Sequence, residues 1–126
     1  ILLAEDNDLN AEIAAVILER AGLKVERVED GLQCISRITE MPAGTYDIIL
    51  MDIQMPKMDG YKATQTIRNL SDQEKACIPI IAMTANAFEE DKRAAIAAGM
   101  NGHIAKPIQV DKLLSILAEM IRQQEN

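Results

Sequence analysis

The chain has 126 residues, of which 48% are hydrophobic and 26% are charged, and its formal net charge is −7. This size and composition are typical of one globular domain with a substantial hydrophobic core. The negative charge argues against nucleic acid and anionic membranes as partners, because both select basic surfaces. No apolar run approaches the roughly 20 residues that a membrane-spanning helix needs.

The start of the chain and its cysteines bear on where the protein works. The chain begins with an apolar run that already looks like a strand, without Met and without a basic segment before it. We therefore expect no signal peptide, and a single domain over residues 1–126 that belongs to a longer multidomain polypeptide. Cys34 and Cys77 are too few for a disulfide framework and lie at no metal-ligand spacing, so we expect reduced thiols in a cytoplasmic protein.

Short apolar runs alternate with helical patterns along the whole chain. Residues 48–51 are apolar without interruption and too short for a helix, which is typical of a strand buried on both faces. Residues 23–28 alternate apolar and polar side chains, which favours a half-exposed edge strand. The expected strands are residues 1–4, 23–28, 48–51, 78–83 and 102–105, and the expected helices are residues 8–21, 30–39, 60–70, 86–99 and 108–124.

Capping residues and apolar spacing define these helices. Asn7 or Asp8, Asp30 and Asp59 are good N-caps, and Asn86 with Glu89 resembles a capping box. We expect residues 71–76 to be a surface loop. The apolar residues at helical spacing are Leu9, Ile13, Val16, Ile17 and Ala21 in the first helix, Leu32, Ile35 and Ile38 in the second, and Leu113, Leu114, Leu117 and Ile121 in the last. In the third helix, Tyr61, Thr64 and Ile67 are expected to face inward.

Strands that alternate with helices indicate an α/β fold with right-handed parallel connections. The half-exposed second strand belongs at one edge, and the Gly-containing fifth strand fits the other. We therefore predict a single five-stranded parallel sheet in the order 2-1-3-4-5, with helices on both faces, as in the flavodoxin-like (βα)5 fold.

Polar residues follow the buried strands where each strand ends. The first strand is followed by Glu5 and Asp6, the third by Asp52, the fourth by Thr84 and the fifth by Lys106. In an open α/β sheet, ligands bind outside the carboxyl ends of the strands. We expect these groups to meet at one rim of the sheet.

This set of groups is sufficient for accepting a phosphoryl group. Three neighbouring carboxylates repel one another unless a cation intervenes. Lys106 offsets part of that charge, and Mg²⁺ prefers carboxylates, water and phosphate oxygens. The Asp52 carboxylate can act as a nucleophile and form an aspartyl phosphate, and phosphoryl transfer needs mainly positioning and charge neutralisation.

Taken singly, each of these residues has a simpler explanation. Glu5 and Asp6 are equally well read as capping residues, and Asp52 as a turn residue. Thr84 suits a strand, and Lys106 a solvated surface. The functional hypothesis depends on four inner strands each ending in a group that one reaction requires.

Five stretches of the chain carry a resemblance to a known family. They are Ile1-Leu2-Leu3-Ala4-Glu5-Asp6-Asn7, Asp30-Gly31, Met51-Asp52-Ile53-Gln54-Met55-Pro56 with Met58-Asp59-Gly60, Ile80-Ile81-Ala82-Met83-Thr84-Ala85, and Ala105-Lys106-Pro107. They are distributed along the chain, and the resemblance extends over essentially its full length. The chain resembles the receiver domains of two-component signalling systems, most of all those fused to hybrid sensor histidine kinases.

The resemblance implies a role for each matching residue. Asp52 would take a phosphoryl group from a phosphohistidine of a histidine kinase or of a histidine phosphotransfer domain. Mg²⁺, or Mn²⁺ in its place, would be bound by Asp6, Asp52 and the backbone carbonyl of Gln54, with Glu5 acting through water. Thr84 and Lys106 would contact the phosphate oxygens.

Further roles implied by the resemblance concern the lifetime and the readout of the phosphorylated state. Gln54 and Asn86 would tune the lifetime of the acyl phosphate, and a cis peptide between Lys106 and Pro107 would aim the ammonium inward. Many receivers carry Tyr or Phe three residues before the Lys, where this chain has His103. The resemblance therefore supports phosphoacceptance but not an aromatic switch.

The resemblance also bears on activity and partners. Such a domain catalyses its own phosphorylation and dephosphorylation, which leaves open whether it is an enzyme in its own right or part of a histidine kinase polypeptide. Neither nucleic acid nor a membrane is expected to contact it, and the oligomeric state stays open. On the helix beside the acidic site, Leu9, Asn10 and Ile13 suggest a docking surface for a phosphohistidine helix, although Ile13 also suits the core.

Other functions on this fold are less well supported. A pseudo-receiver that acts only as an interaction module has no need of all five of Glu5, Asp6, Asp52, Thr84 and Lys106. A flavodoxin needs phosphate-binding donors where this chain has Glu-Asp-Asn-Asp. A haloacid-dehalogenase-like phosphatase needs a second Asp where this chain has Gln54.

Overall fold

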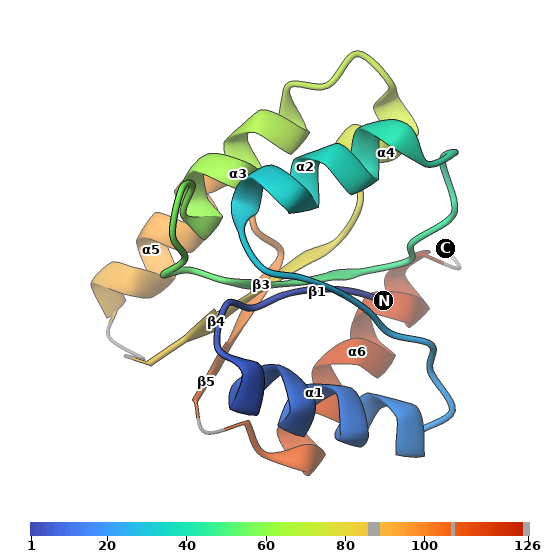
Figure 1. Cartoon of the computed structure of the whole chain (residues 1–126), viewed down its shortest axis with the longest axis vertical. Helices are drawn as coiled ribbons and strands as arrows, with labels where there is room; N and C mark the ends of the chain where they lie inside the picture. The colour runs from blue at the N-terminus through green and yellow to red at the C-terminus, as the bar shows by residue number, and fades with distance from the viewer. Residues whose placement is uncertain (86–88, 107, 125–126) are drawn as a thin grey trace.

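Five parallel strands form one sheet in the order β2-β1-β3-β4-β5, as predicted. The computed structural model describes residues 1–85, 89–106 and 108–124 (Figure 1). The register pairs Ala4 of β1 with Met51 of β3, and Asp52 of β3 with Met83 of β4. The strands are β1 (Leu2–Ala4), β2 (Glu26–Val28), β3 (Ile49–Asp52), β4 (Ile80–Thr84) and β5 (Gly102–Ala105).

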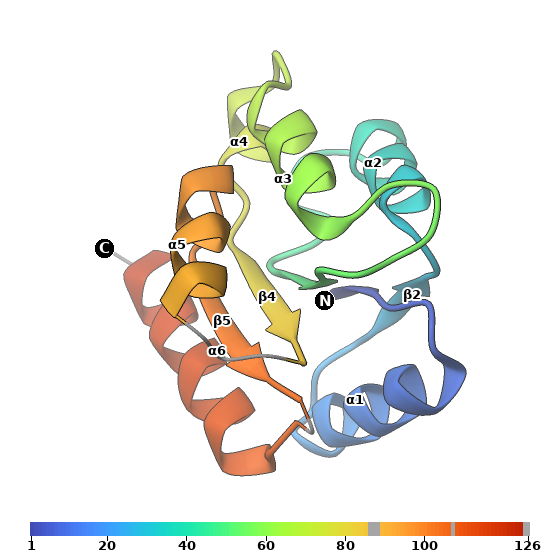
Figure 2. The ribbon, with the colours of Figure 1, turned by 90° about the vertical axis from the view of Figure 1, so that its left-hand side faces the viewer.

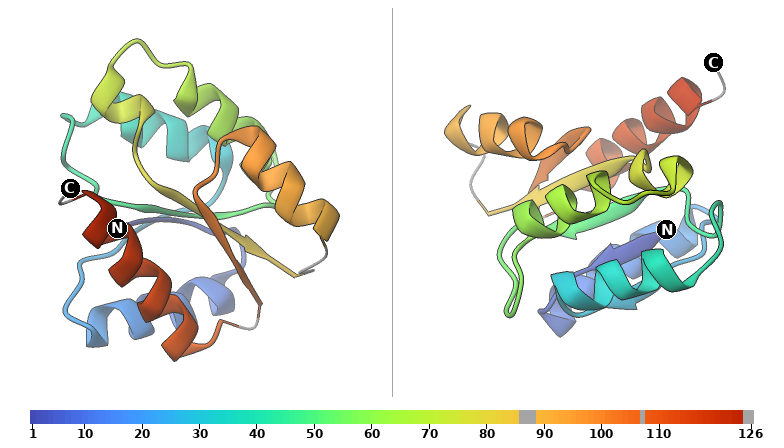
Figure 3. Two further views of the ribbon diagram at one scale, coloured as in Figure 1. Left: turned by 180° about the vertical axis from the view of Figure 1, so that it is seen from behind. Right: turned by 90° about the horizontal axis from the view of Figure 1, so that it is seen from above.

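Helices cover both faces of this sheet. Figures 1 and 3 show α2, α3 and α5 on one side and α1 and α6 on the other. The helices are α1 (Asp8–Arg20), α2 (Gly31–Glu40), α3 (Gly60–Arg68), α4 (Gln73–Ala76), α5 (Glu89–Ala98) and α6 (Val110–Gln124). The predicted layers of the α/β fold are therefore confirmed.

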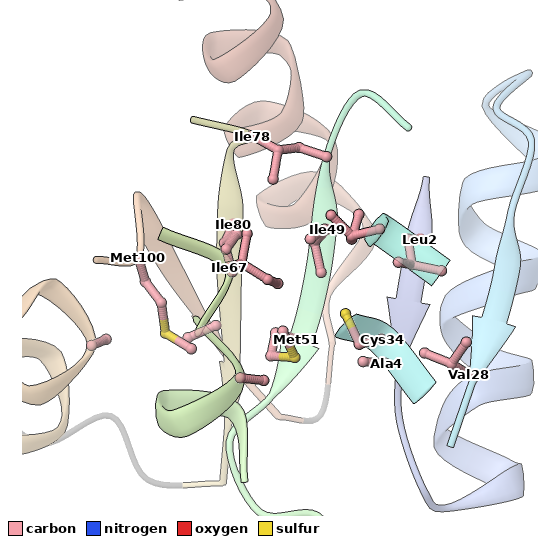
Figure 4. Close-up of a cluster of buried hydrophobic side chains, with 14 residues drawn as sticks. Leu2, Ala4, Val28, Cys34, Ile49, Met51, Ile67, Ile78, Ile80 and Met100 are labelled. Atoms are coloured by element: carbon pink, nitrogen blue, oxygen red, sulfur yellow. The ribbon is translucent and has the colours of Figure 1, made fainter. Parts of the chain in front are cut away.

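Alternate residues of each central strand enter opposite halves of the core. In β3, Ile49 and Met51 pack beneath α2 and α3, whereas Leu50 faces α1 and α6. Figure 4 shows the first of these halves, in which Cys34 of α2 and Ile67 of α3 meet the strand side chains. Burial of both faces explains why these strands are apolar without interruption.

Local signals set the helix ends. The side chains of Asn7, Asp30 and Asp59 each accept a hydrogen bond from the backbone N–H three residues later, so the predicted caps are confirmed for α1, α2 and α3. Gly22, just beyond α1, has a φ of 89°, a left-handed conformation that glycine adopts without strain. The predicted cap at Asn86 lies outside the described residues.

Two predicted elements differ from the structure. The expected loop at residues 71–76 contains the short helix α4, which Asp72 caps through bonds from the N–H groups of Glu74 and Lys75. The expected edge strand at 23–28 pairs with β1 only over Glu26–Val28. β1 itself has only three paired residues, so the partner strand cannot extend further.

The apolar spacing of α1 predicted the buried face of that helix only in part. Ile17 packs against the core, but Leu9, Ile13 and Val16 are exposed by 65%, 44% and 41%. The buried residues of α1 are Ala11, Ala14 and Leu18, which also have helical spacing. Leu32 and Ile121 are likewise exposed, while Cys34 in α2 and Met120 in α6 are buried.

None of the helices within the described ranges is both long enough and apolar enough to cross a membrane.

Candidate functional site

The carboxyl ends of four neighbouring strands place the candidate residues around one cavity. Figures 1 and 2 show the strands running to the same side of the molecule. The cavity there has a volume of about 380 Å³. Its lining includes the predicted residues Glu5, Asp6, Asp52, Gln54, Thr84 and Lys106.

Lys106 is held between two buried carboxylates. Its ammonium Nζ lies 2.9 Å from Oδ2 of Asp52 and 3.0 Å from Oε2 of Glu5. The exposed fractions of the two carboxylate side chains are 6% and 2%. Charge-assisted contacts to carboxylates that are so deeply buried are strong, because water and salt screen them little.

The β-strand ends fix the positions of these carboxylates. Oδ1 of Asp52 accepts a bond from the backbone N–H of Gln54 at 3.3 Å, and Oε1 of Glu5 accepts one from the N–H of Asn7 at 3.2 Å. The guanidinium of Arg27 donates to the backbone carbonyl of Glu5 through Nε at 3.1 Å and Nη2 at 3.0 Å. Each acid is therefore tied to the turn that follows its strand.

The end of β4 supports the Lys106 backbone. The N–H of Lys106 donates to the carbonyl of Thr84 at 2.8 Å, which continues the pairing of β4 with β5 beyond the last strand residue. Thr84 is itself buried and lines the same cavity. Its hydroxyl-bearing side chain and the ammonium thus belong to adjacent chain segments at one wall.

Close backbone packing holds the other side of Asp52. Gly60, the first residue of α3, donates its N–H to the carbonyl of Ile53 at 2.9 Å. A Cβ atom at this position would collide with the carbonyl oxygen of Asp52. The sequence match Asp59-Gly60 therefore has a steric reason, since only glycine lets α3 start so near the end of β3.

The pKa of Asp52 is raised to about 6, because burial and the Glu5 carboxylate, which raise it, outweigh Lys106, which lowers it. Burial alone would lower the pKa of Lys106, but its hydrogen bonds and attraction to Asp52 and Glu5 raise that pKa overall. The site therefore keeps the Lys106 ammonium charged and disfavours ionisation of Asp52.

The acidic cluster, Glu5, Asp6 and Asp52, fits a hard divalent cation. One carboxylate oxygen from each residue lies within 4.8 Å of the others. Oε2 of Glu5 is buried, and the Lys106 ammonium lies 3.0 Å from it. One ammonium cannot neutralise three carboxylates, and a bound divalent cation would relieve their repulsion.

The structure adds two residues that the sequence did not place at the site, since Tyr61 of α3 and Asp91 of α5 line the cavity. Asn10 of α1, expected on a docking surface beside the site, lines it as well. Asp91 was interpretable from sequence only as a first-turn acid that favours a helix N-terminus. Its position follows from the packing of α5 beside α3 and β5, which no local sequence pattern predicts.

Three predicted residues are not tested by this geometry. Asn86 and Pro107 lie outside the described residues, so the predicted cis peptide stays a prediction. His103 is partly buried on β5, where it pairs with Ala82 of β4, and it is not among the residues that line the cavity.

Known proteins are similar to this chain in both sequence and fold. The family model described as response regulator receiver domain matches residues 1–118. The chain is 38% identical over 117 residues to the signal transduction histidine-protein kinase BarA of Escherichia coli strain K12, covering 93% of this chain and 12% of that protein. It is 36% identical over 135 residues to the hybrid signal transduction histidine kinase B of Dictyostelium discoideum, covering 100% of this chain and 7% of that protein.

Two solved structures bear on metal and partner. The receiver domain of the sensor histidine kinase PA1611 from Pseudomonas aeruginosa PAO1, with a magnesium ion coordinated in its active site cleft, is 39% identical with a TM-score of 0.85, over 95% of this chain and 94% of that one. A co-crystal structure of the Saccharomyces cerevisiae histidine phosphotransfer protein Ypd1 and the receiver domain of Ssk1 matches at 27% identity and a TM-score of 0.88, over 98% of this chain and 88% of that chain. The curated relatives named above are much longer than this chain.

Proposed function

Because the chain belongs to the response regulator receiver domain family, we propose that it is the phosphoacceptor of a phosphorelay. Asp52 would accept a phosphoryl group from a phosphohistidine of a histidine kinase or a histidine phosphotransfer domain. The observation that carries this proposal is the ion pair of Lys106 with Asp52 at 2.9 Å, inside an acidic cluster at a cavity. A purely structural ion pair has no need of two further acids beside it.

The proposed step is a direct displacement. A carboxylate oxygen of Asp52 attacks phosphorus, the P–N bond of the donor breaks, and its electron pair returns to the imidazole nitrogen. Lys106 and Thr84 would contact the phosphoryl oxygens as charge shifts onto them. When bound by Glu5, Asp6, Asp52 and the Gln54 carbonyl, Mg²⁺ or Mn²⁺ would supply the remaining charge neutralisation.

The release of Lys106 from Asp52 links phosphorylation to signalling. An aspartyl phosphate carries more negative charge than the carboxylate it replaces. Lys106 and Thr84, which share a backbone hydrogen bond, would follow that charge and shift the loop after β4 and the end of β5. Gln54 and Asn86 would set the lifetime of the phosphorylated state, and His103 would stand in place of the usual aromatic residue.

The exposed face of α1 supports docking of a phosphohistidine helix. Leu9 and Ile13 are exposed apolar residues on the helix that begins beside the acidic cluster. A small apolar cavity of about 60 Å³, lined by Asn10, Ile13, Lys106 and Ile108, joins this face to the site. The same proposal places the domain in the cytoplasm, where Cys34 and Cys77 remain free thiols.

The decisive experiment is phosphorylation in vitro followed by intact mass measurement. The chain is incubated with Mg²⁺ and acetyl phosphate, and in parallel with a phosphorylated histidine phosphotransfer protein. We expect the mass of one phosphoryl group to be added, a loss of this gain with chelator, and no gain in Asp52→Asn.

Asp72→Asn is the matched control, because it makes the same chemical change at the cap of α4 while Asn preserves the capping bonds. This control should be phosphorylated like the wild type. A folded wild-type protein that gains no mass from either donor would contradict the proposal and favour a pseudo-receiver.

A further inference from the structure

One wall of the cavity carries a charge that the proposed reaction has not used. Asp91, in the first turn of α5, lines the cavity together with Tyr61 of α3. Figure 2 shows α5 on the same side of the sheet as α3, and α5 packs against α3 and β5. Tyr61 responds electrostatically to this acid, since burial first and then the Asp91 carboxylate raise the pKa of its hydroxyl.

Asp91 is separate from the acidic cluster. The cluster has carboxylate oxygens within 4.8 Å of one another, and Asp91 is not part of that group. Lys106 contacts Asp52 and Glu5, not Asp91, among the ion pairs of the described residues. A cation bound by the cluster would therefore not neutralise Asp91, which lines the same cavity.

A negative charge at the cavity wall affects phosphodonors differently, according to the charge of the group that leaves. An acyl phosphate transfers its phosphoryl group by breaking a P–O bond, and the departing carboxylate takes the electron pair as an anion. In a phosphoramidate with a protonated nitrogen, the P–N bond breaks and the nitrogen leaves as a neutral amine. A fixed negative charge nearby opposes the departure of the carboxylate anion and favours the approach of the donor with the protonated nitrogen.

We propose, on the premise of the phosphoacceptor function, that Asp91 sets the phosphodonor preference of this cavity. Its carboxylate favours donors that leave through a protonated nitrogen and disfavours acyl phosphates. Asp91 is thus a specificity-determining residue, and Glu90, exposed in the same turn of α5, is not. A role limited to the helix dipole would make the two acids equivalent.

The test compares two small donors in the presence of Mg²⁺. Phosphorylation rates with phosphoramidate and with acetyl phosphate are measured for wild type, Asp91→Asn, Asp91→Glu and Glu90→Gln. In Asp91→Asn we expect the ratio of the phosphoramidate rate to the acetyl phosphate rate to fall roughly three- to tenfold, and the change to shrink at high salt. Asp91→Glu should retain the wild-type ratio, and Glu90→Gln should not alter it.

The outcomes separate the two proposals. An unchanged ratio in a phosphorylated Asp91→Asn protein overturns the role of Asp91 alone, as does an equal change in Glu90→Gln. A wild-type protein that takes no phosphoryl group from either donor overturns the phosphoacceptor function itself, and the role of Asp91 with it.

Discussion

The two ends of the sheet each hold a partly buried cation, and they satisfy it in opposite ways. At the carboxyl end, Lys106 contacts the carboxylates of Asp52 and Glu5. At the amino end, the guanidinium of Arg68 donates to the backbone carbonyls of Ala76, Ile78 and Gly99 and to the side chain of Asn101, at 2.6 to 2.8 Å. Asn101 in turn accepts from the N–H of Ile80 at 2.9 Å.

This difference separates a structural cation from a reactive one. The partners of Arg68 are neutral oxygens that need donors, so the network is complete and joins α3, α4, β4 and the turn after α5. Lys106 faces more carboxylates than it can neutralise, so an excess of negative charge remains at its end of the sheet. A complete hydrogen-bond network favours stability, whereas an excess of carboxylates favours the binding of a cation.

Removing Arg68 gives the largest expected loss of stability. Arg68→Met leaves three carbonyls and the Asn101 side chain without their donor, so we expect the free energy of unfolding to fall by about 3 kcal/mol. Urea unfolding of the wild type and of Arg68→Met measures this loss of stability. Lys106→Met is the matched change at the other end, and it should cost less stability yet slow phosphorylation; a larger loss of stability in Lys106→Met would contradict the comparison.

Adding a methyl group at Gly60 tests the backbone packing of the reactive end. In Gly60→Ala the new Cβ meets the Asp52 carbonyl and the backbone of Ile53, which cannot give way, so we expect a loss of about 2 kcal/mol and slower phosphorylation. Gly102→Ala is the control, because there the Cβ meets the flexible tip of Ile116. Equal losses in the two variants, measured by thermal and urea unfolding, would show that no special contact exists at Gly60.

Neutralising Asp52 should stabilise the metal-free protein. Its pKa of about 6 in the folded state exceeds the ordinary 3.8, so the folded state binds more protons between these values. The free energy of unfolding therefore falls as the pH rises from about 4 to about 6, and it stays low above this range. In Asp52→Asn this loss is absent, so at neutral pH the variant should be more stable by roughly 1 to 2 kcal/mol.

The pH series of urea unfolding in chelator checks this prediction. The gap between Asp52→Asn and wild type should close below about pH 4, and added Mg²⁺ should stabilise the wild type more than the variant. A gap that is the same at every pH would exclude ionisation of Asp52 as its cause.

Thr64 supplies the smallest effect and separates an unsatisfied group from a functional one. Its hydroxyl is buried in α3 and has no hydrogen-bond partner among the described residues. Thr64→Val removes this oxygen at nearly the same shape, so we expect a gain of up to about 1 kcal/mol. Phosphorylation should be unchanged, and a slower reaction would assign Thr64 to the site.

Local sequence patterns determined the layers, the sheet order, three of the helix caps and the residues that end each strand. These follow from chemistry within a few residues: apolar runs for β3 and β4, Asn7, Asp30 and Asp59 as caps, and Gly22 as a stop. Because parallel strands bring their carboxyl ends to one rim, the meeting of Asp52 and Lys106 was also predictable.

Only the tertiary structure decided which of two apolar faces α1 buries, where α4 forms, and that Asp91 reaches the cavity. It also decided that Arg68 would bridge four segments of the chain. The physical reason is that spacing and capping act over one or two helical turns, whereas these contacts depend on how closely whole helices approach the sheet. In α1 the buried face contains Ala11, Ala14 and Leu18, and Leu9 and Ile13 are left exposed.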